Sequence, residues 1–283
     1  MKAAPTLSSI PTSDSVLCFD VAVIELLGHE AAETCAADLG VEAEAAATVS
    51  VRVVSRSSGS DNVPQRRRRA ADGAGVPVVL LIEDTTRLAP GWAAALCDAF
   101  TDPSVAAVCG PIEVAPSLAP RYRALGRLEY GRFDGTRPED HLPGNAFAVR
   151  LADLQQTLAP GEGIVEHDLE RRLVMASRKV RRIAALTAIY AQPDPHGARL
   201  STRFGHGRLY GAGRGGNPAL GVLKAGLAMP VLSLRALRAA RAAGSVRQWL
   251  PEVPWIVLMA TAWALGELTG QIAGKGNSEG SWN

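Results

Sequence analysis

Aromatic residues are scarce in this sequence and make up only 5% of its 283 residues. Proteins that bind single-stranded nucleic acid interleave aromatic side chains with basic ones, whereas the arginine run at residues 66–69 contains no aromatic residue. We therefore expect no nucleic acid among the partners. The motifs HExxH and GxxxxGK[ST] are also absent from the sequence, so metalloprotease and P-loop nucleotide triphosphatase functions have no support.

Cysteine is sparse as well, with four residues at widely separated positions: Cys18, Cys35, Cys97 and Cys109. They form no CxxC pair, and the five histidines do not stand at metal-ligand spacings, so we expect no zinc site. No secretory signal precedes them. The cysteines are therefore expected to be small buried side chains in a cytoplasmic protein.

Long hydrophobic runs are missing near the C-terminus, although the composition there is apolar. The charge-free stretch between Glu252 and Glu267 has 14 residues, and a membrane-spanning helix needs about 20. A buried or interfacial helix fits better, preceded by a basic amphipathic helix at residues 218–243. Tryptophans at 249, 255 and 263 suit a membrane boundary or a core equally well. A peripheral position at the inner face of the membrane is one of the two alternatives.

The first half of the chain alternates strand-like and helix-like segments. This order predicts an α/β fold with a mostly parallel sheet flanked by helices, followed by a C-terminal helical extension. The predicted strands cover residues 16–24, 49–55, 76–82 and 105–112, and the helices between them cover 30–40, 66–75 and 91–100. We divide the chain into an α/β domain (1–215), a helical, membrane-associating region (216–274) and a flexible tail (275–283).

Two carboxylates end the most apolar strand in the sequence VVLLIEDTTRLAPGW, residues 78–92. Open α/β sheets bind ligands at the carboxyl ends of their strands, so Glu83 and Asp84 are candidate site residues. A later helix is predicted at residues 166–180, with Leu169, Leu173 and Ala176 on one face. The arginine run at 66–69 is interpreted as a solvated face, with phosphate or lipid binding as the alternative.

Four segments, taken in order, resemble the family 2 glycosyltransferases. They are VAVIELLGHEAAETCAADLG, VVLLIEDTTRLAPGWAAALCDAFTDPSVAAVCGPI, LPGNAFAVRLADL and VEHDLERRLVMASRKVRRI, within residues 16–215. The resemblance implies a GT-A fold with a Rossmann-like half sheet, a nucleotide-sugar donor, and transfer of the sugar to an acceptor hydroxyl, with inversion. The acceptor class stays open between a lipid-linked molecule, a polysaccharide and a small molecule.

The resemblance also implies roles for individual residues. Glu166 falls where the family carries its general base, and the alternative is a helix-capping acid. The implied donor-binding residues are Glu25, Ser55, Arg56, Glu83, Asp84 and Thr85. The implied acceptor-binding residues are Gly144, Asn145, His167, Arg203, His206 and Arg208, with surface solubility as the alternative for Arg203 and Arg208. Glu83 and Asp84 would hold a divalent cation, Mg²⁺ or Mn²⁺.

Several family positions are altered in this chain. Thr85 stands where a carboxylate normally holds the metal, and a neutral hydroxyl is a weak ligand for a hard cation. The segment from Ser55 to Gly59 replaces acidic residues that grip the nucleotide base in the family. These changes support an alternative function, a non-catalytic glycosyltransferase-like binding or assembly subunit. They also raise the alternative that arginines replace the metal.

Overall fold

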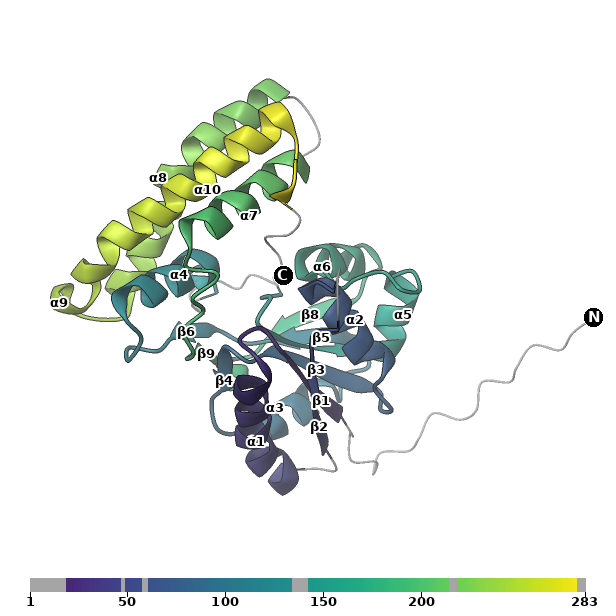
Figure 1. Cartoon of the computed structure of the whole chain (residues 1–283). Coiled ribbons are helices and arrows are strands. Elements are labelled where there is room, and N and C mark those ends of the chain that lie inside the picture. The colour runs from purple at the N-terminus through teal and green to yellow at the C-terminus, as the bar shows by residue number, and fades with distance from the viewer. Residues whose placement is uncertain (1–18, 47–48, 58–60, 134–141, 214–217, 279–283) are drawn as a thin grey trace, which may run out of the picture.

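The computed structural model describes residues 19–46, 49–57, 61–133, 142–213 and 218–278. Its centre is a six-stranded sheet with the strand order β2-β1-β3-β7-β5-β8. The strands are β1 (Phe19–Ile24), β2 (Val49–Val54), β3 (Val78–Glu83), β5 (Val105–Cys109), β7 (Ala146–Arg150) and β8 (Lys179–Arg182). Every neighbouring pair is parallel except the two that include β7. This mostly parallel sheet, flanked by helices, confirms the predicted α/β class (Figure 1).

Helices cover both faces of the sheet, so β3 is buried on both sides. On one face, α1 (His29–Ala46) and α3 (Trp92–Ala99) share a core with the even-numbered apolar residues of β3. On the other face, α2 (Val63–Asp72), α5 (Leu151–Thr157) and α6 (Glu166–Met175) share a core with its odd-numbered ones. A continuous apolar strand fits this double burial, because successive side chains point to opposite faces.

Strand β7 runs antiparallel to both of its neighbours, and it lies beyond the predicted alternation of strands and helices, which ended at residue 112. The chain enters β7 at the carboxyl end of β3, where the Glu83 amide donates to the Asn145 carbonyl oxygen at 2.9 Å. Pairing then runs backward from Ile82 opposite Ala146 to Val78 opposite Arg150. The reversal places the residues that precede β7 beside the acids that end β3.

The predicted strand at 105–112 is broken in two. It forms β5 in the main sheet and β6 (Ile112–Val114) in a second sheet of order β4-β9-β6, with β4 (Thr86–Leu88) and β9 (Ala188–Tyr190). The chain changes sheets at Gly110, where an added Cβ would meet the Leu186 carbonyl oxygen. Only glycine permits this close backbone approach.

The helix predicted at 166–180 is too long. Helix α6 ends at Met175, and Ser177 has a φ of 57°, a left-handed conformation that helices do not continue through. Residues 179–182 instead form β8, parallel to β5. The two predicted inward leucines, Leu169 and Leu173, are fully buried, whereas Ala176 lies beyond the helix and is exposed.

The cysteines are mostly small core side chains, as expected. Cys35 and Cys109 are buried and Cys97 is half-buried, while Cys18 lies outside the described residues. Burial raises the pKa of the Cys35 thiol to about 12, with the negative charge of Asp84 as the second cause. Cys35 is therefore protonated at neutral pH.

Three long helices form a bundle beside the α/β body (Figure 1). They are α7 (Leu200–Gly213), α8 (Pro218–Ala242) and α10 (Val253–Ala273), with the short α9 (Val246–Trp249) between the last two. Helix α4 (Pro120–Tyr130) packs against both α8 and α10 and joins the bundle to the body. The predicted domain boundary at 215–216 and the last tail residues, 279–283, lie outside the described residues.

Helices α7 and α10 approach each other at backbone distance. Added Cβ atoms on Gly207 and Gly211 of α7 would meet the carbonyl oxygens of Trp263 and Glu267 in α10. The glycines at 266 and 270 of α10 face α7 in the same way. Small residues four apart on both helices allow such close packing, which is common among membrane helices.

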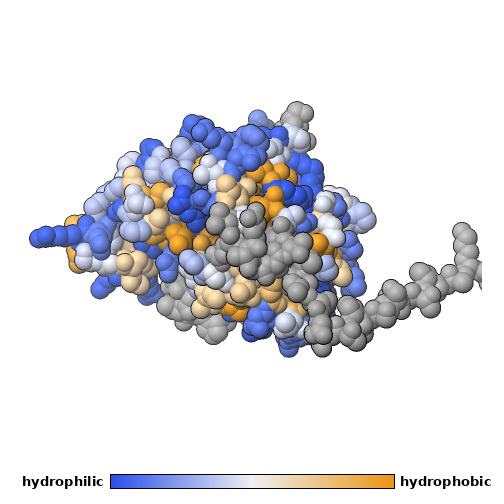
Figure 2. Space-filling model, turned by 90° about the horizontal axis from the view of Figure 1, so that it is seen from below, coloured by the Kyte–Doolittle hydropathy of each residue, from blue (hydrophilic) through white to orange (hydrophobic). Residues whose placement is uncertain are grey.

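Two segments of the bundle, Ala219–Ala242 and Val246–Ala273, are long and apolar enough to cross a membrane by length and composition alone. The sequence prediction considered only the 14-residue charge-free stretch and judged it too short. In the most apolar windows of the two segments, 17% and 33% of the residues are buried, so most of the apolar surface faces outward. The underside of the molecule, in contrast, mixes hydrophobic and hydrophilic residues (Figure 2).

Candidate active site

The acids that end β3 point into the protein rather than into bulk solvent. Glu83 is 7% exposed and Asp84 is 1% exposed. Their strand pairs with β1 on one side and β7 on the other, so both neighbouring strands contribute walls around the carboxylates. A buried carboxylate is stable only where hydrogen bonds or opposite charges compensate for lost water.

Asp84 is compensated by backbone amides. Its Oδ2 accepts hydrogen bonds from the amides of Leu26 and Leu27, each at 2.9 Å, and thereby closes the loop that follows β1. Desolvation raises the pKa of Asp84, while these two amide bonds lower it. Its Oδ1 is buried and has no hydrogen-bond partner among the described residues.

Glu83 is compensated by an arginine from the run at 66–69. Arg67 Nη2 donates to Glu83 Oε1 at 2.9 Å, and Arg67 Nη1 donates to Glu166 Oε2 at 2.9 Å. One guanidinium therefore joins the acid at the end of β3 to the acid at the start of α6. The structure brings together two residues that lie 83 positions apart in the sequence.

The interpretation of the arginine run as a solvated face is wrong for three of its four residues, and only Arg69 is exposed. Arg66, Arg67 and Arg68 are all buried, and Arg67 is 4% exposed. Helix α2 has the sequence VPQRRRRAAD and packs against the sheet. Because a helix on a sheet must bury one face, and this one has few apolar residues, arginine stems fill the buried positions.

Burial beside Arg67 raises the pKa of Glu83 to about 8. Desolvation is the largest cause, and the negative charge of Glu166 adds to it, while Arg67 acts in the opposite direction. The pKa of Arg67 is itself raised, since the two carboxylates outweigh its burial. Burial in this cluster therefore favours the protonated form of Glu83 at neutral pH.

Gly144 and Asn145 form the wall between the two acids. Arg67 Nη2 also donates to the Gly144 carbonyl oxygen. An added Cβ on Gly144 would lie 3.2 Å from Arg67 Nη2 and 3.4 Å from Glu166 Oε1. Asn145 is fully buried and donates through Nδ2 to Thr86 Oγ1 at 3.1 Å. Glycine at 144 thus leaves room beside the Glu166 oxygen that does not contact Arg67.

A second ion pair lies at the edge of this cluster and was not predicted. Arg203 of α7 pairs with Glu129 of α4 and stacks over the Trp263 ring, 4.9 Å from its centroid. Burial raises the pKa of Glu129, and the Glu166 carboxylate contributes to the rise. Arg203 is therefore a buried bridge between the bundle and the body rather than a surface residue.

The other predicted residues spread around and beyond this centre. Arg66 Nη1 donates to the Glu25 carbonyl oxygen, and Arg69 Nη2 donates to that of Ser55. Ser55 and Arg56 are exposed at the end of β2, and His167 is exposed on α6. His206 is half-buried on α7. Arg208 Nε donates to the Gly274 carbonyl oxygen, just beyond the end of α10.

The residues at the end of β3 do not fit a divalent cation. Glu83 already pairs with Arg67, one oxygen of Asp84 is engaged by two amides, and Thr85 offers a neutral hydroxyl. Across the residues that the structure describes, no three His, Cys, Asp or Glu side chains are grouped to hold an ion. Mg²⁺ is usually held by one or two carboxylates together with water and substrate phosphates, whereas here Arg67 and two amides already engage one oxygen of each acid. The Arg67 guanidinium supplies the positive charge there.

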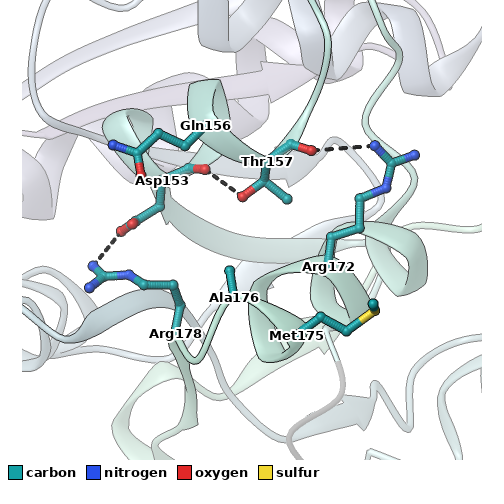
Figure 3. A pocket seen from close by; sticks show the side chains of 7 residues that line it. All are labelled: Asp153, Gln156, Thr157, Arg172, Met175, Ala176 and Arg178. Atoms are coloured by element: carbon teal, nitrogen blue, oxygen red, sulfur yellow. Dashed lines mark hydrogen bonds and ion pairs between the residues drawn. The ribbon is translucent and has the colours of Figure 1, made fainter.

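An open pocket on another side of the body contains none of the predicted site residues. It lies between α5 and α6 (Figure 3) and is lined by Asp153, Gln156, Thr157, Arg172, Met175, Ala176 and Arg178. Some of its polar groups pair with one another: Arg178 pairs with Asp153 at 2.7 Å and Arg172 donates to the Thr157 carbonyl oxygen at 3.3 Å.

Comparison with known proteins gives distant likenesses only. No protein-family model matches the chain, and no curated protein matches it in sequence. The mannosyltransferase PcManGT from Pyrobaculum calidifontis, in complex with GDP-Man and Mn²⁺, is 14% identical, with 90% of this chain and 87% of that chain covered and a TM-score of 0.47. A structure of GalNAc-T7 with UDP, GalNAc and Mn²⁺ is 12% identical, with 65% of this chain covered and a TM-score of 0.40. This chain spans 45% of GalNAc-T7. At these levels neither likeness assigns an activity.

Proposed function

We propose that the protein is a glycosyltransferase, a divergent relative of family 2, that moves a sugar from a nucleotide-sugar donor to an acceptor hydroxyl with inversion. The observation that carries the proposal is the Arg67 bridge, which holds Glu166 beside the carboxyl end of β3. Ligands of open α/β sheets bind at such strand ends. A proton acceptor on the neighbouring helix then faces the ligand.

The chemistry follows from the positions of the two Glu166 oxygens. Oε2 accepts from Arg67, which fixes the carboxylate, and Oε1 lies beside the small Gly144. In the proposed step the acceptor hydroxyl gives its proton to Oε1 as its oxygen bonds to the anomeric carbon. The bond from that carbon to the donor phosphate breaks, and its electron pair leaves with the diphosphate. A fixed base placed in line lowers the barrier through orientation and proton transfer.

The donor is proposed to lie across the ends of β1, β2 and β3, against Glu25, Ser55, Arg56, Glu83, Asp84 and Thr85. Positive charge for the diphosphate is available from α2. Arg66 donates once to the Glu25 carbonyl oxygen, and its Nε and Nη2 have no hydrogen-bond partner among the described residues. An arginine fork matches phosphate oxygens well. The acceptor is proposed to enter past Gly144, Asn145 and Arg203, with His167 and His206 farther out.

The proposal is tested by replacing Glu166 with glutamine. The amide cannot accept the proton, so we expect Glu166→Gln to bind donor normally and to lose transfer by about a hundredfold or more. Transfer is measured as nucleotide release from a panel of sugar nucleotides in the presence of candidate acceptors. Asp168→Asn is the matched control, because it makes the same change two residues along α6 in a side chain of similar exposure. Full transfer by Glu166→Gln would remove Glu166 from the mechanism.

A non-catalytic binding or assembly subunit is the second candidate function. Two contacts favour it: Arg67 occupies one oxygen of Glu166, and Asp84 is engaged in holding the Leu26–Leu27 amides. Under this alternative the protein binds nucleotide sugars or a protein partner without turnover. Donor binding measured by calorimetry, with no nucleotide release from any member of the panel, would select it. For either function we place the protein in the cytoplasm, at the inner face of a membrane.

A further inference from the structure

A long segment of the chain carries positive charge only. Residues 195–251 contain nine lysines and arginines and no aspartate or glutamate. Most of this segment forms α7, α8 and α9. The whole chain has a net charge of only +2, so the charge is strongly asymmetric. Such asymmetry favours contact with an anionic surface.

An apolar stripe runs along the outward face of α8. Its residues follow one another at helical spacings of three and four: Leu220, Leu223, Leu227, Val231 and Leu234. All are strongly exposed, and Leu223 is 60% exposed. The same helical face continues into Arg238 and Arg241, which are also exposed. The opposite face of α8 is buried, with Ala225 and Ala236 fully covered.

Helix α10 presents a matching outward face. Leu258, Leu265 and Ile272 recur at intervals of seven residues and are exposed, whereas Ile256 and Met259 are buried. The one acid within α10, Glu267, is buried in the bundle and accepts from Trp263 Nε1 at 3.2 Å. Helices α8 and α10 therefore expose a row of large apolar side chains each, while the acid Glu267 is buried.

The packing of the bundle favours lipid contact on one face rather than insertion across a bilayer. The polar helix α7 lies along α10 in close backbone contact. At the other end, Arg123 of α4 pairs with Glu252 at 2.6 Å and donates to the Gln248 carbonyl oxygen at 2.9 Å. A spanning α10 would have to break these contacts or take α7 and α4 into lipid. Amphipathic helices instead lie in the interface with the apolar face down.

We propose that the outward face of α8 and α10, called here the α8–α10 face, docks the protein onto membranes that contain anionic lipids. The apolar residues of the stripe enter the boundary between headgroups and acyl chains, and Arg238, Arg241 and Arg247 contact the anionic headgroups. Arg247 is exposed on α9, at the same end of α8 as the other two. The proposal does not depend on the transfer chemistry.

Vesicle flotation of the full chain tests the docking. We expect binding to phosphatidylcholine vesicles that contain phosphatidylglycerol, weak binding to pure phosphatidylcholine, and weakening at about 0.5 M NaCl because salt screens surface charge. Arg238→Gln with Arg241→Gln should lower the affinity for anionic vesicles roughly 25-fold, about fivefold for each arginine. The matched control is Arg87→Gln with Arg171→Gln, two exposed arginines of the α/β body, which should change the affinity by less than about twofold.

The apolar stripe is tested separately with Leu223→Ser and Leu227→Ser. Both side chains are exposed, so circular dichroism should show an unchanged fold, while vesicle binding is lost. The proposal would be overturned if the wild-type protein floated with neither type of vesicle, or if the serine variant bound vesicles as well as the wild-type protein does. A wild-type dimer in sedimentation that the serine variant converts to monomer, without vesicle binding, would assign the α8–α10 face to a second copy instead. Donor turnover is measured without vesicles, so its failure is distinguishable from a failure of docking.

Discussion

Arg67 is the residue on which both acids of the candidate site depend. It is the cation that Glu83 and Glu166 share, and it is almost fully buried. Removing one partner of a buried ion pair leaves an uncompensated charge, which costs about 3–5 kcal/mol. We expect Arg67→Met to lower the free energy of unfolding by about that amount, measured by urea denaturation. Arg171→Met, at an exposed ion pair on α6, should cost about 1 kcal/mol or less. Equal losses in the two variants would contradict the bridging role of Arg67.

Glu83 links the stability of the fold to pH. Its pKa in the folded protein, about 8, lies above its ordinary value of 4.5 because burial disfavours the charged form. The folded protein therefore holds a proton that the unfolded chain releases, so this contribution is complete below the ordinary pKa and is lost as pH rises toward 8. Between about pH 5 and pH 8, the wild-type protein should lose more unfolding free energy than Glu83→Gln. If the unfolding free energies of the two proteins changed with pH in the same way, the raised pKa of Glu83 would be contradicted.

The contacts of the acids at the end of β3 predict how the protein responds to metals. The carboxylates at the end of β3 are engaged by Arg67 and by the amides of Leu26 and Leu27, so we expect no specific Mn²⁺ binding in calorimetry. Transfer should persist after treatment with EDTA. Loss of transfer in EDTA that returns with added Mn²⁺ would show that the donor completes a metal site that these residues alone do not form.

At the scale of elements, the contact between α7 and α10 depends on glycine. An added Cβ on Gly211 would meet the Glu267 carbonyl oxygen, so the helices must separate. We expect Gly211→Ala to lower the free energy of unfolding by about 1–3 kcal/mol. Gly226 of α8 has nothing within 4 Å of an added Cβ, and Gly226→Ala should instead be neutral or stabilise by up to about 1 kcal/mol. Urea denaturation of both variants separates the two effects. A stable Gly211→Ala protein would contradict the close packing.

Sequence patterns predict some of the strands and miss the direction or the limits of others. The apolar run at 78–82 fits a strand with helices on both faces, because successive side chains of a strand point to opposite faces. Strand β3 is indeed buried on both faces. Strand β7 was not predicted as a strand. Its antiparallel direction depends on where the chain re-enters the sheet, and that is a property of the whole fold. The split of β5 from β6 likewise depends on a distant contact between Gly110 and Leu186.

At the scale of the whole molecule, the sequence predicted the two acids but not the residue that joins them. Glu83 was predicted from its place at the end of an apolar strand, whereas Glu166 was predicted only through the resemblance to family 2 glycosyltransferases. Arginine runs are usually solvated, and nothing local distinguished this one. The composition of α2 could have predicted the buried arginines, because this helix has too few apolar residues to cover a sheet without burying arginine. Arg203 was missed as a buried bridge for a similar reason, since its partner Glu129 lies on a distant helix.

The α/β body and the bundle together leave two separate surfaces, one with the acid cluster and one with the α8–α10 face. The central claim concerns the first, that a nucleotide sugar binds at the carboxyl ends of β1 and β3 with its anomeric carbon toward Glu166. A crystal structure with a bound, non-transferable nucleotide sugar tests this most directly. We expect the diphosphate beside Glu83 and the α2 arginines, with the sugar within reach of Glu166 Oε1. A nucleotide bound elsewhere, such as in the pocket between α5 and α6, or a sugar turned away from Glu166, would contradict the account.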